Sequence, residues 1–166
     1  MDNFQKDNPD IKVKVVREST GTMAAKMMAE KDNPQADVLF EMAATVALNM
    51  ETQGMFHPYT PKGMDKIDQR YVDKEGEVNW VGNYGWAGCI CWNTVEAKKL
   101  GLPKPKSWAD LTNPIYKGLI SMPNPNSSGT GFLDVSSWIQ VMGEDAAWTY
   151  MDALHKNVGV YTHSGS

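Results

Sequence analysis

The stretch LISMPNPNSSGTGFLDVSSWIQVM, residues 119–142, contains the pattern that decides the fold prediction. Its apolar start, residues 119–122, predicts a strand, and residues 132–142 predict a helix. Between them lies a loop rich in Gly, Ser, Asn and Pro. Such a loop brings the free N–H groups of the following helix toward one point, where they can hold an anion. The stretch therefore predicts an α/β fold with an anion site at a helix N-terminus.

Small polar residues form three clusters, each after an apolar run. Glycine lets the backbone approach a ligand, Ser and Thr donate hydroxyl hydrogen bonds, and successive N–H groups form a nest for negative charge. Ordinary turns and helix caps use the same residues, so a single cluster leaves both interpretations open. The clusters are Ser19-Thr20-Gly21-Thr22, Ser127-Ser128-Gly129-Thr130-Gly131 and Ser164-Gly165-Ser166.

The segments around the first cluster predict a βαβ unit. Residues 11–16 and 36–40 are rich in β-branched and apolar side chains, which favours strands, and residues 23–31 favour a helix. We expect the two strands to be parallel and joined by a right-handed crossover. The first cluster and Glu41 then lie at the carboxyl ends of the strands, where open α/β sheets bind ligands.

The rest of the chain completes the first lobe and predicts a second one. Residues 43–53 favour a helix closed by Gly54, a further helix begins at Glu144, and residues 158–161 favour a strand. Residues 78–81 and 86–92 predict extended segments that form a hinge. We therefore place the first lobe at residues 1–84 and the hinge with the second lobe at residues 85–166.

Composition excludes several classes of protein. The 166 residues carry a formal net charge of -4, with no face that gathers Lys and Arg, which argues against nucleic acid. No apolar run is long enough to cross a bilayer, and residues 1–4 do not resemble a secretion signal, so the chain is cytoplasmic or its export segment is missing. Cys89 and Cys91 lie in an apolar run and predict buried free thiols rather than a disulfide or half of a metal site.

Several segments together resemble the type II periplasmic solute-binding proteins of ABC importers, in the branch of the ferric-iron and 2-aminoethylphosphonate receptors. The resemblance covers nearly the whole chain. It rests on Asn8-Pro9-Asp10-Ile11-Lys12-Val13, Ala36-Asp37-Val38, Pro105-Lys106-Ser107-Trp108-Ala109-Asp110-Leu111, Pro114-Ile115-Tyr116-Lys117-Gly118, Asn126-Ser127-Ser128-Gly129-Thr130 and the closing Ser-Gly-Ser.

The resemblance implies two α/β lobes joined by a strand hinge, which close on a ligand and deliver it to a membrane permease. It implies a location in the periplasm or on a lipid-anchored extracytoplasmic surface. Members of the family begin with a signal peptide and one more strand and continue well beyond Ser166, so the resemblance implies a fold that is incomplete at both ends. An empty strand position exposes a sheet edge and favours self-association.

The resemblance also implies ligand contacts from both lobes. Glu41 is a further candidate for a metal or an amino group, although a solvated or helix-capping carboxylate explains it equally. His163 adjoins the third cluster and is a weaker candidate. Tyr84, Trp86 and Trp92 could line the cleft, but we expect core packing for the two tryptophans. The implied contacts are Ser19, Thr20, Gly21 and Thr22 from the first lobe, and Ser127, Ser128, Gly129, Thr130, Ser164 and Ser166 from the second.

Hydroxyls and amides in loops without Lys or Arg favour a tetrahedral oxyanion, with a phosphonate or phosphate as first choice. Ferric iron is the alternative, and it requires oxygen ligands such as Tyr and carboxylates. In the iron-binding relatives a tyrosine pair lies in a part of the sequence that is absent here. We expect no cofactor and no bound metal beyond that alternative ligand.

A hydrolase that uses a loop Ser with His163 and Asp134 is the competing class. The sequence contains neither the Gly-x-Ser-x-Gly elbow nor a nucleotide-binding Gly-x-x-x-x-Gly-Lys motif. We therefore predict a binding protein and not an enzyme.

Overall fold

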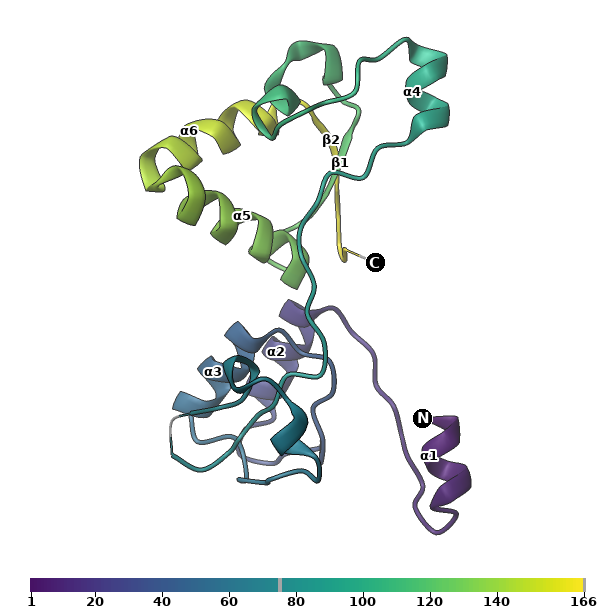
Figure 1. Cartoon of the computed structure of the whole chain (residues 1–166), viewed down its shortest axis with the longest axis vertical. Helices are drawn as coiled ribbons and strands as arrows, with labels where there is room; N and C mark the ends of the chain where they lie inside the picture. Colours follow the sequence, from purple (N-terminus) through teal and green to yellow (C-terminus); the bar gives the residue numbers. More distant parts are fainter. Residues whose placement is uncertain (75, 166) are drawn as a thin grey trace.

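The computed structural model describes residues 1–74 and 76–165. Helices α2 (Thr20–Ala29) and α3 (Ala44–Thr52) lie in one lobe. Helices α4 (Thr94–Leu100), α5 (Gly129–Met142) and α6 (Glu144–His155) lie in the other lobe with both strands (Figure 1). An extended stretch of chain joins the lobes. This is the predicted two-lobed arrangement, and the boundary at residues 84 and 85 stays a prediction.

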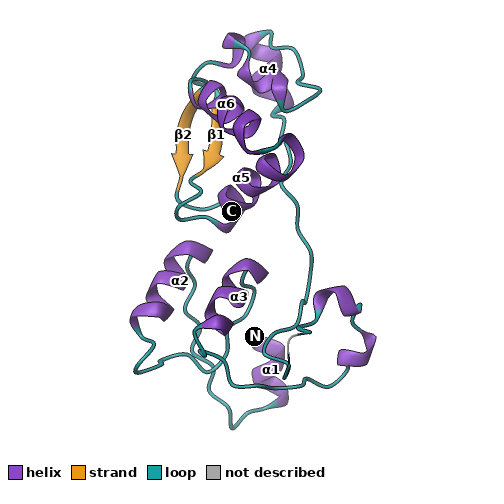
Figure 2. Cartoon of the chain, turned by 90° about the vertical axis from the view of Figure 1, so that its left-hand side faces the viewer, coloured by secondary structure: helices purple, strands orange, loops and turns teal. Residues whose placement is uncertain are grey.

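The second lobe is built around a parallel strand pair, β1 (Ile120–Pro123) and β2 (Val158–Thr162). Figure 2 shows the strands side by side. Helices α5 and α6 form the connection between them, and the turn at Gly143 has a φ of 82°, which glycine adopts without strain. The strand, loop and helix predicted from residues 119–142 are therefore confirmed.

The second lobe also holds the main apolar core. Trp138 packs edge-on against Trp108 and Tyr150, with ring centroids 5.5 and 5.2 Å apart. Burial, with a smaller contribution from the Asp134 carboxylate, raises the pKa of Tyr150 to about 12. Helix α5 thus packs against α6 through aromatic contacts, which contribute more stability than the burial of their apolar area alone would give. The buried cluster comprises Leu111, Met122, Trp138, Ala147, Tyr150 and Leu154.

Asn157 joins three parts of the second lobe. The residue is 3% exposed, and its Nδ2 donates hydrogen bonds to the backbone carbonyls of Leu111 at 2.8 Å and Asn113 at 2.7 Å. Leu111 lies in the short 3-10 turn η3 (Ala109–Thr112), and Asn113 joins η3 to the next turn, η4 (Pro114–Tyr116). Asn157 therefore holds the start of β2 against both turns. No helix of the described residues is long and apolar enough to cross a membrane.

The first lobe has a smaller core than the second. The first lobe contains α1 (Asp2–Asp7), α2, α3 and the turns η1 (Met64–Lys66) and η2 (Gln69–Tyr71). Ala47 and Met50 on α3 are buried, and an antiparallel bridge pairs Val72 with Val81. Helix α3 ends just before Gly54, whose φ of 65° closes the helix as predicted.

The prediction of strands at residues 11–16 and 36–40 is wrong. Neither segment forms a strand, and within the described chain neither makes a ladder hydrogen bond. Val38 is 78% exposed and Phe40 59% exposed. β-Propensity describes how a side chain fits an existing pleated surface, and without a pairing neighbour it forms no strand. The predicted βαβ unit and its crossover are therefore absent from these segments, although α2 forms where expected.

In the extended segment between the lobes, successive side chains point to opposite sides. Ile90 packs against the core of the second lobe, and Trp92 contacts Tyr116 edge-on with centroids 6.3 Å apart. Cys89 and Cys91 lie on the other side as exposed free thiols. The prediction of free thiols is confirmed, but the prediction of burial is wrong because successive side chains of an extended segment face opposite sides and the side with the thiols is exposed.

Candidate functional site

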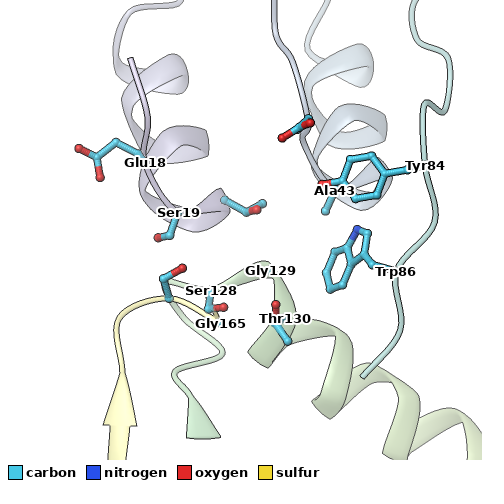
Figure 3. A pocket seen from close by; sticks show the side chains of 12 residues that line it. Glu18, Ser19, Ala43, Tyr84, Trp86, Ser128, Gly129, Thr130 and Gly165 are labelled. Carbon is cyan, nitrogen blue, oxygen red and sulfur yellow. The ribbon is translucent and has the colours of Figure 1, made fainter. Parts of the chain in front are cut away.

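A cavity of about 320 Å³ lies between the lobes, where the N-termini of α2 and α5 face each other (Figure 3). Residues of both lobes line it. They are Glu18, Ser19, Thr20, Glu41, Ala43, Tyr84, Trp86, Ser128, Gly129, Thr130, Ser164 and Gly165. The structure thus brings together parts of all three small-residue clusters, which are far apart in the sequence.

The N-terminus of α5 forms one wall. Ser128 caps the helix: the residue is 3% exposed, and its Oγ accepts a hydrogen bond from the N–H of Gly131 at 3.4 Å. Across the described hydrogen bonds, the N–H groups of Gly129 and Thr130 donate to no protein acceptor. A Cβ at Gly131 would lie 2.8 Å from the backbone N of Pro125, so only glycine allows this close packing. The loop therefore presents two free N–H groups and the Thr130 hydroxyl at the cavity.

The N-terminus of α2 forms the opposite wall. Ser19 is the N-cap residue, but its Oγ donates to the carbonyl of Ser127 at 2.6 Å instead of capping its own helix. Thr20 lies directly against α5, since a Cβ built on Gly129 would be 2.8 Å from Thr20 Oγ1. Two helix N-termini, each carrying partial positive charge, are therefore directed at one small volume.

Two residues of the third cluster also line the cavity, beside the N-terminus of α5. Ser164 and Gly165 follow β2, and the Ser164 carbonyl accepts a hydrogen bond from Thr162 Oγ1 at 2.7 Å. Gly165 lies against Thr130: a Cβ added at Gly165 would lie 2.7 Å from the Thr130 Cβ. Ser166 was also predicted as a contact and lies outside the described residues.

Two aromatic rings and two carboxylates also line the cavity. Tyr84 is 56% exposed and Trp86 42% exposed, and Figure 3 shows both rings facing the cavity. The expectation that Trp86 packs in the core is therefore wrong. Glu41 has a φ of 63°, an uncommon left-handed conformation for a residue other than glycine. Glu18 also lines the cavity, with its side chain directed away from the two rings.

The charges at the cavity are carboxylates. No Lys or Arg is among the lining residues of the described chain. An anion in this cavity must therefore be held by N–H groups, hydroxyls and helix dipoles rather than by an ion pair.

Seven of the predicted contacts line the cavity: Ser19, Thr20, Glu41, Ser128, Gly129, Thr130 and Ser164. Gly21, Thr22 and Ser127 do not line it and lie instead where the two lobes touch. Ala43, Gly165 and Glu18 were missed as lining residues. Gly165 belongs to the third cluster, Glu18 directly precedes Ser19, and Ala43 lies two residues after Glu41, so each was close in sequence to a predicted contact.

The proposed Ser–His–Asp set is not assembled. Ser128 hydrogen-bonds to Gly131, the His163 ring lies beside Ser19 and Thr22, and Asp134 lies against Gly88. Burial raises the pKa of Asp134 above its usual value. Among the residues that the structure describes, no group of three or more His, Cys, Asp or Glu could hold a metal ion.

Residues 33–164 match the family described as bacterial extracellular solute-binding protein. The chain belongs to this family. The fold of this solute-binding protein is also found in solved structures: the periplasmic binding protein AfuA from Actinobacillus pleuropneumoniae, with fructose-6-phosphate bound, is 34% identical with a TM-score of 0.83. That alignment covers 99% of this chain and 52% of AfuA. The predicted two-lobed periplasmic-binding-protein fold, incomplete relative to its neighbours, is therefore confirmed.

Two curated relatives are similar to most of this chain. An uncharacterized protein of Haemophilus influenzae is 34% identical over 159 residues, covering 94% of this chain and 46% of the relative. A probable ABC transporter periplasmic-binding protein, y4fP of Sinorhizobium fredii, is 26% identical, covering 86% of this chain and 40% of the relative. The solute-binding protein thus spans about half the length of the relatives it matches.

Proposed function

We propose that this protein is the solute-binding component of an ABC importer and that it captures a small organic phosphate or phosphonate between its lobes. One observation carries the proposal: two helix N-termini and the hydroxyls of three clusters converge on one cavity that no cationic side chain lines in the described chain. N–H groups and hydroxyls arranged in this way suit a tetrahedral oxyanion.

The size of the cavity favours an organic ligand. A volume of 320 Å³ lies at the lower end of the roughly 300–1,000 Å³ typical of small-molecule sites. Water occupies about 30 Å³ per molecule in the liquid, so the cavity has room for much more than a bare phosphate. The rings of Tyr84 and Trp86 offer an apolar surface for the rest of the ligand.

The relatives support the same class of ligand and the same partners. AfuA is described with fructose-6-phosphate bound, and y4fP as a probable component of an ABC transporter. By this analogy the partner is a membrane permease, and the location is the periplasm or a lipid-anchored extracytoplasmic surface. The role is binding rather than catalysis, and ferric iron stays the alternative ligand.

Calorimetric titration of the 166-residue chain tests the proposal. We expect fructose 6-phosphate and 2-aminoethylphosphonate to bind weakly, with Kd above the micromolar range, and fructose to give no heat. Thr130→Ala removes a hydroxyl at the cavity and should weaken binding about fivefold or more, the effect of one lost hydrogen bond. Thr149→Ala, which removes an exposed hydroxyl on α6, is the matched control. Fructose binding as well as its phosphate, or heat from ferric citrate alone, would overturn the proposal.

A further inference from the structure

We propose that Ser127 and His163 of the second lobe form a clasp with Ser19, Gly21 and Thr22 of the first lobe, and that this clasp positions the two halves of the anion site. The inference deepens the proposed function and rests on it for the ligand measurements only. Four direct contacts between protein atoms define the clasp.

Ser127 provides the centre of the clasp. Its carbonyl oxygen accepts two hydrogen bonds from the first lobe, from Ser19 Oγ at 2.6 Å and from the N–H of Gly21 at 3.0 Å. Its own Oγ donates to the carbonyl of His163 at 2.8 Å. The loop before α5 and the segment after β2 are thereby tied together and meet the first lobe as one unit.

His163 adds a second pair of contacts. Its Nε2 lies 3.3 Å from Ser19 Oγ and 3.3 Å from Thr22 Oγ1. The Ser19 hydroxyl proton is donated to the Ser127 carbonyl, so Ser19 Oγ can only accept from a protonated Nε2. The Thr22 hydroxyl can donate or accept, so it can hydrogen-bond with either ring tautomer of His163. Ser19 is shared between the Ser127 carbonyl and the His163 ring, so the two halves of the clasp act on the same first-lobe residue.

Gly21 allows the lobes to approach each other. A Cβ at this position would lie 2.7 Å from the carbonyl oxygen of Asn126 and 2.9 Å from that of Ser127. Both atoms are backbone, so they cannot move aside as a flexible side chain would. Any larger residue at position 21 must therefore separate the lobes at the clasp.

Most clasp residues do not line the cavity. Gly21, Thr22, Ser127 and His163 are absent from its lining, and only Ser19 contributes to both. The clasp therefore acts on the balance between open and closed lobes and has the same effect on every ligand. A protein that is closed only part of the time binds with an affinity reduced by that fraction.

Energy transfer between dyes on the two lobes tests the clasp. The dyes are placed at Tyr59→Cys and Val141→Cys, positions that are 71% and 82% exposed, after Cys89→Ser and Cys91→Ser remove the native thiols. His163→Ala should lower the closed-to-open ratio about fivefold without added ligand, and His163→Gln, which keeps a polar group near Nε2, should restore most of it. His155→Ala is the matched control, because the His155 ring lies on the second lobe against Tyr161 and, within the described chain, makes no hydrogen bond or ring contact with the first lobe.

The ligand measurements separate this inference from the proposed function. In His163→Ala, the affinities for fructose 6-phosphate and inorganic phosphate should fall by the same factor, while the unfolding temperature stays that of the His155→Ala control. Equal energy transfer in His163→Ala and His155→Ala would overturn the clasp, as would an affinity loss for one ligand alone, which would place His163 on the ligand. If the unmodified chain binds neither ligand but the transfer change occurs, the proposed function fails and the clasp stands.

Discussion

Replacing Asn157 by alanine should destabilise the second lobe by about 3 kcal/mol. The residue is 3% exposed, and its side-chain amide donates hydrogen bonds of 2.8 and 2.7 Å to the carbonyls of Leu111 and Asn113. In the alanine variant the Leu111 carbonyl has no partner among the described hydrogen bonds, whereas the Asn113 carbonyl keeps the N–H of Tyr116 at 3.0 Å. An unsatisfied buried group costs about 1–3 kcal/mol, and the lost second bond about 1 kcal/mol more.

Urea unfolding followed by tryptophan fluorescence measures this loss, because Trp108 and Trp138 lie in or against the second-lobe core. For a chain of this size, 3 kcal/mol corresponds to a fall in unfolding temperature of roughly 6–12 °C. The matched control is Asn8→Ala, which removes one exposed hydrogen bond of 2.9 Å to the Phe4 carbonyl. We expect that control to change stability by less than about 0.5 kcal/mol.

The same substitution reaches the candidate site. Asn157 directly precedes β2, and β2 leads to His163 and the third cluster. We therefore expect weaker binding of fructose 6-phosphate alongside the lower stability. A loss below about 1 kcal/mol, or one equal to that of Asn8→Ala, would refute the reasoning that the buried Leu111 carbonyl needs the Asn157 amide.

Three further changes test other parts of the structure. Gly131→Ala should destabilise the α5 loop and weaken phosphate-ester binding in calorimetry, because its Cβ would lie 2.8 Å from the backbone N of Pro125; unchanged stability and binding would contradict this. Burial raises the pKa of Asp134 above its ordinary value of 3.8, so the folded state binds the proton more tightly than the unfolded state does. Asp134→Asn should therefore raise the free energy of unfolding at pH 7, and urea titrations should show the gain shrinking as the pH falls to 3.8; a gain independent of pH would oppose this. Val38 is 78% exposed, so light scattering should show concentration-dependent self-association that Val38→Lys reduces, and a monomer at every concentration would argue against it.

Sequence patterns predicted the second lobe well. Residues 119–142 form a strand, a loop and a helix, and β2 and α6 also form where expected. These elements bury their apolar faces against one another within about 50 residues of chain, so local periodicity and tertiary packing favour the same structure.

The same reasoning from local pattern fails for the strands of the first lobe. Residues 11–16 are as β-branched as a strand requires, but no neighbouring segment of the described chain forms a ladder with them. A strand needs a pairing strand from elsewhere in the chain, and the side-chain pattern of one segment does not show whether such a strand lies beside it.

The candidate site divides in the same way. The sequence by itself determined the three clusters of Gly, Ser and Thr, because the chemistry of holding an anion without a cation depends on residue type. Only the tertiary structure decided which members face the cavity and which join the lobes. Thr20 lines the cavity, whereas the neighbouring Gly21 contacts Ser127 on the other lobe. Adjacent residues at a helix N-terminus point in different directions, so their roles depend on where the second helix lies, and that position is set by the core of the other lobe and not by the cluster itself.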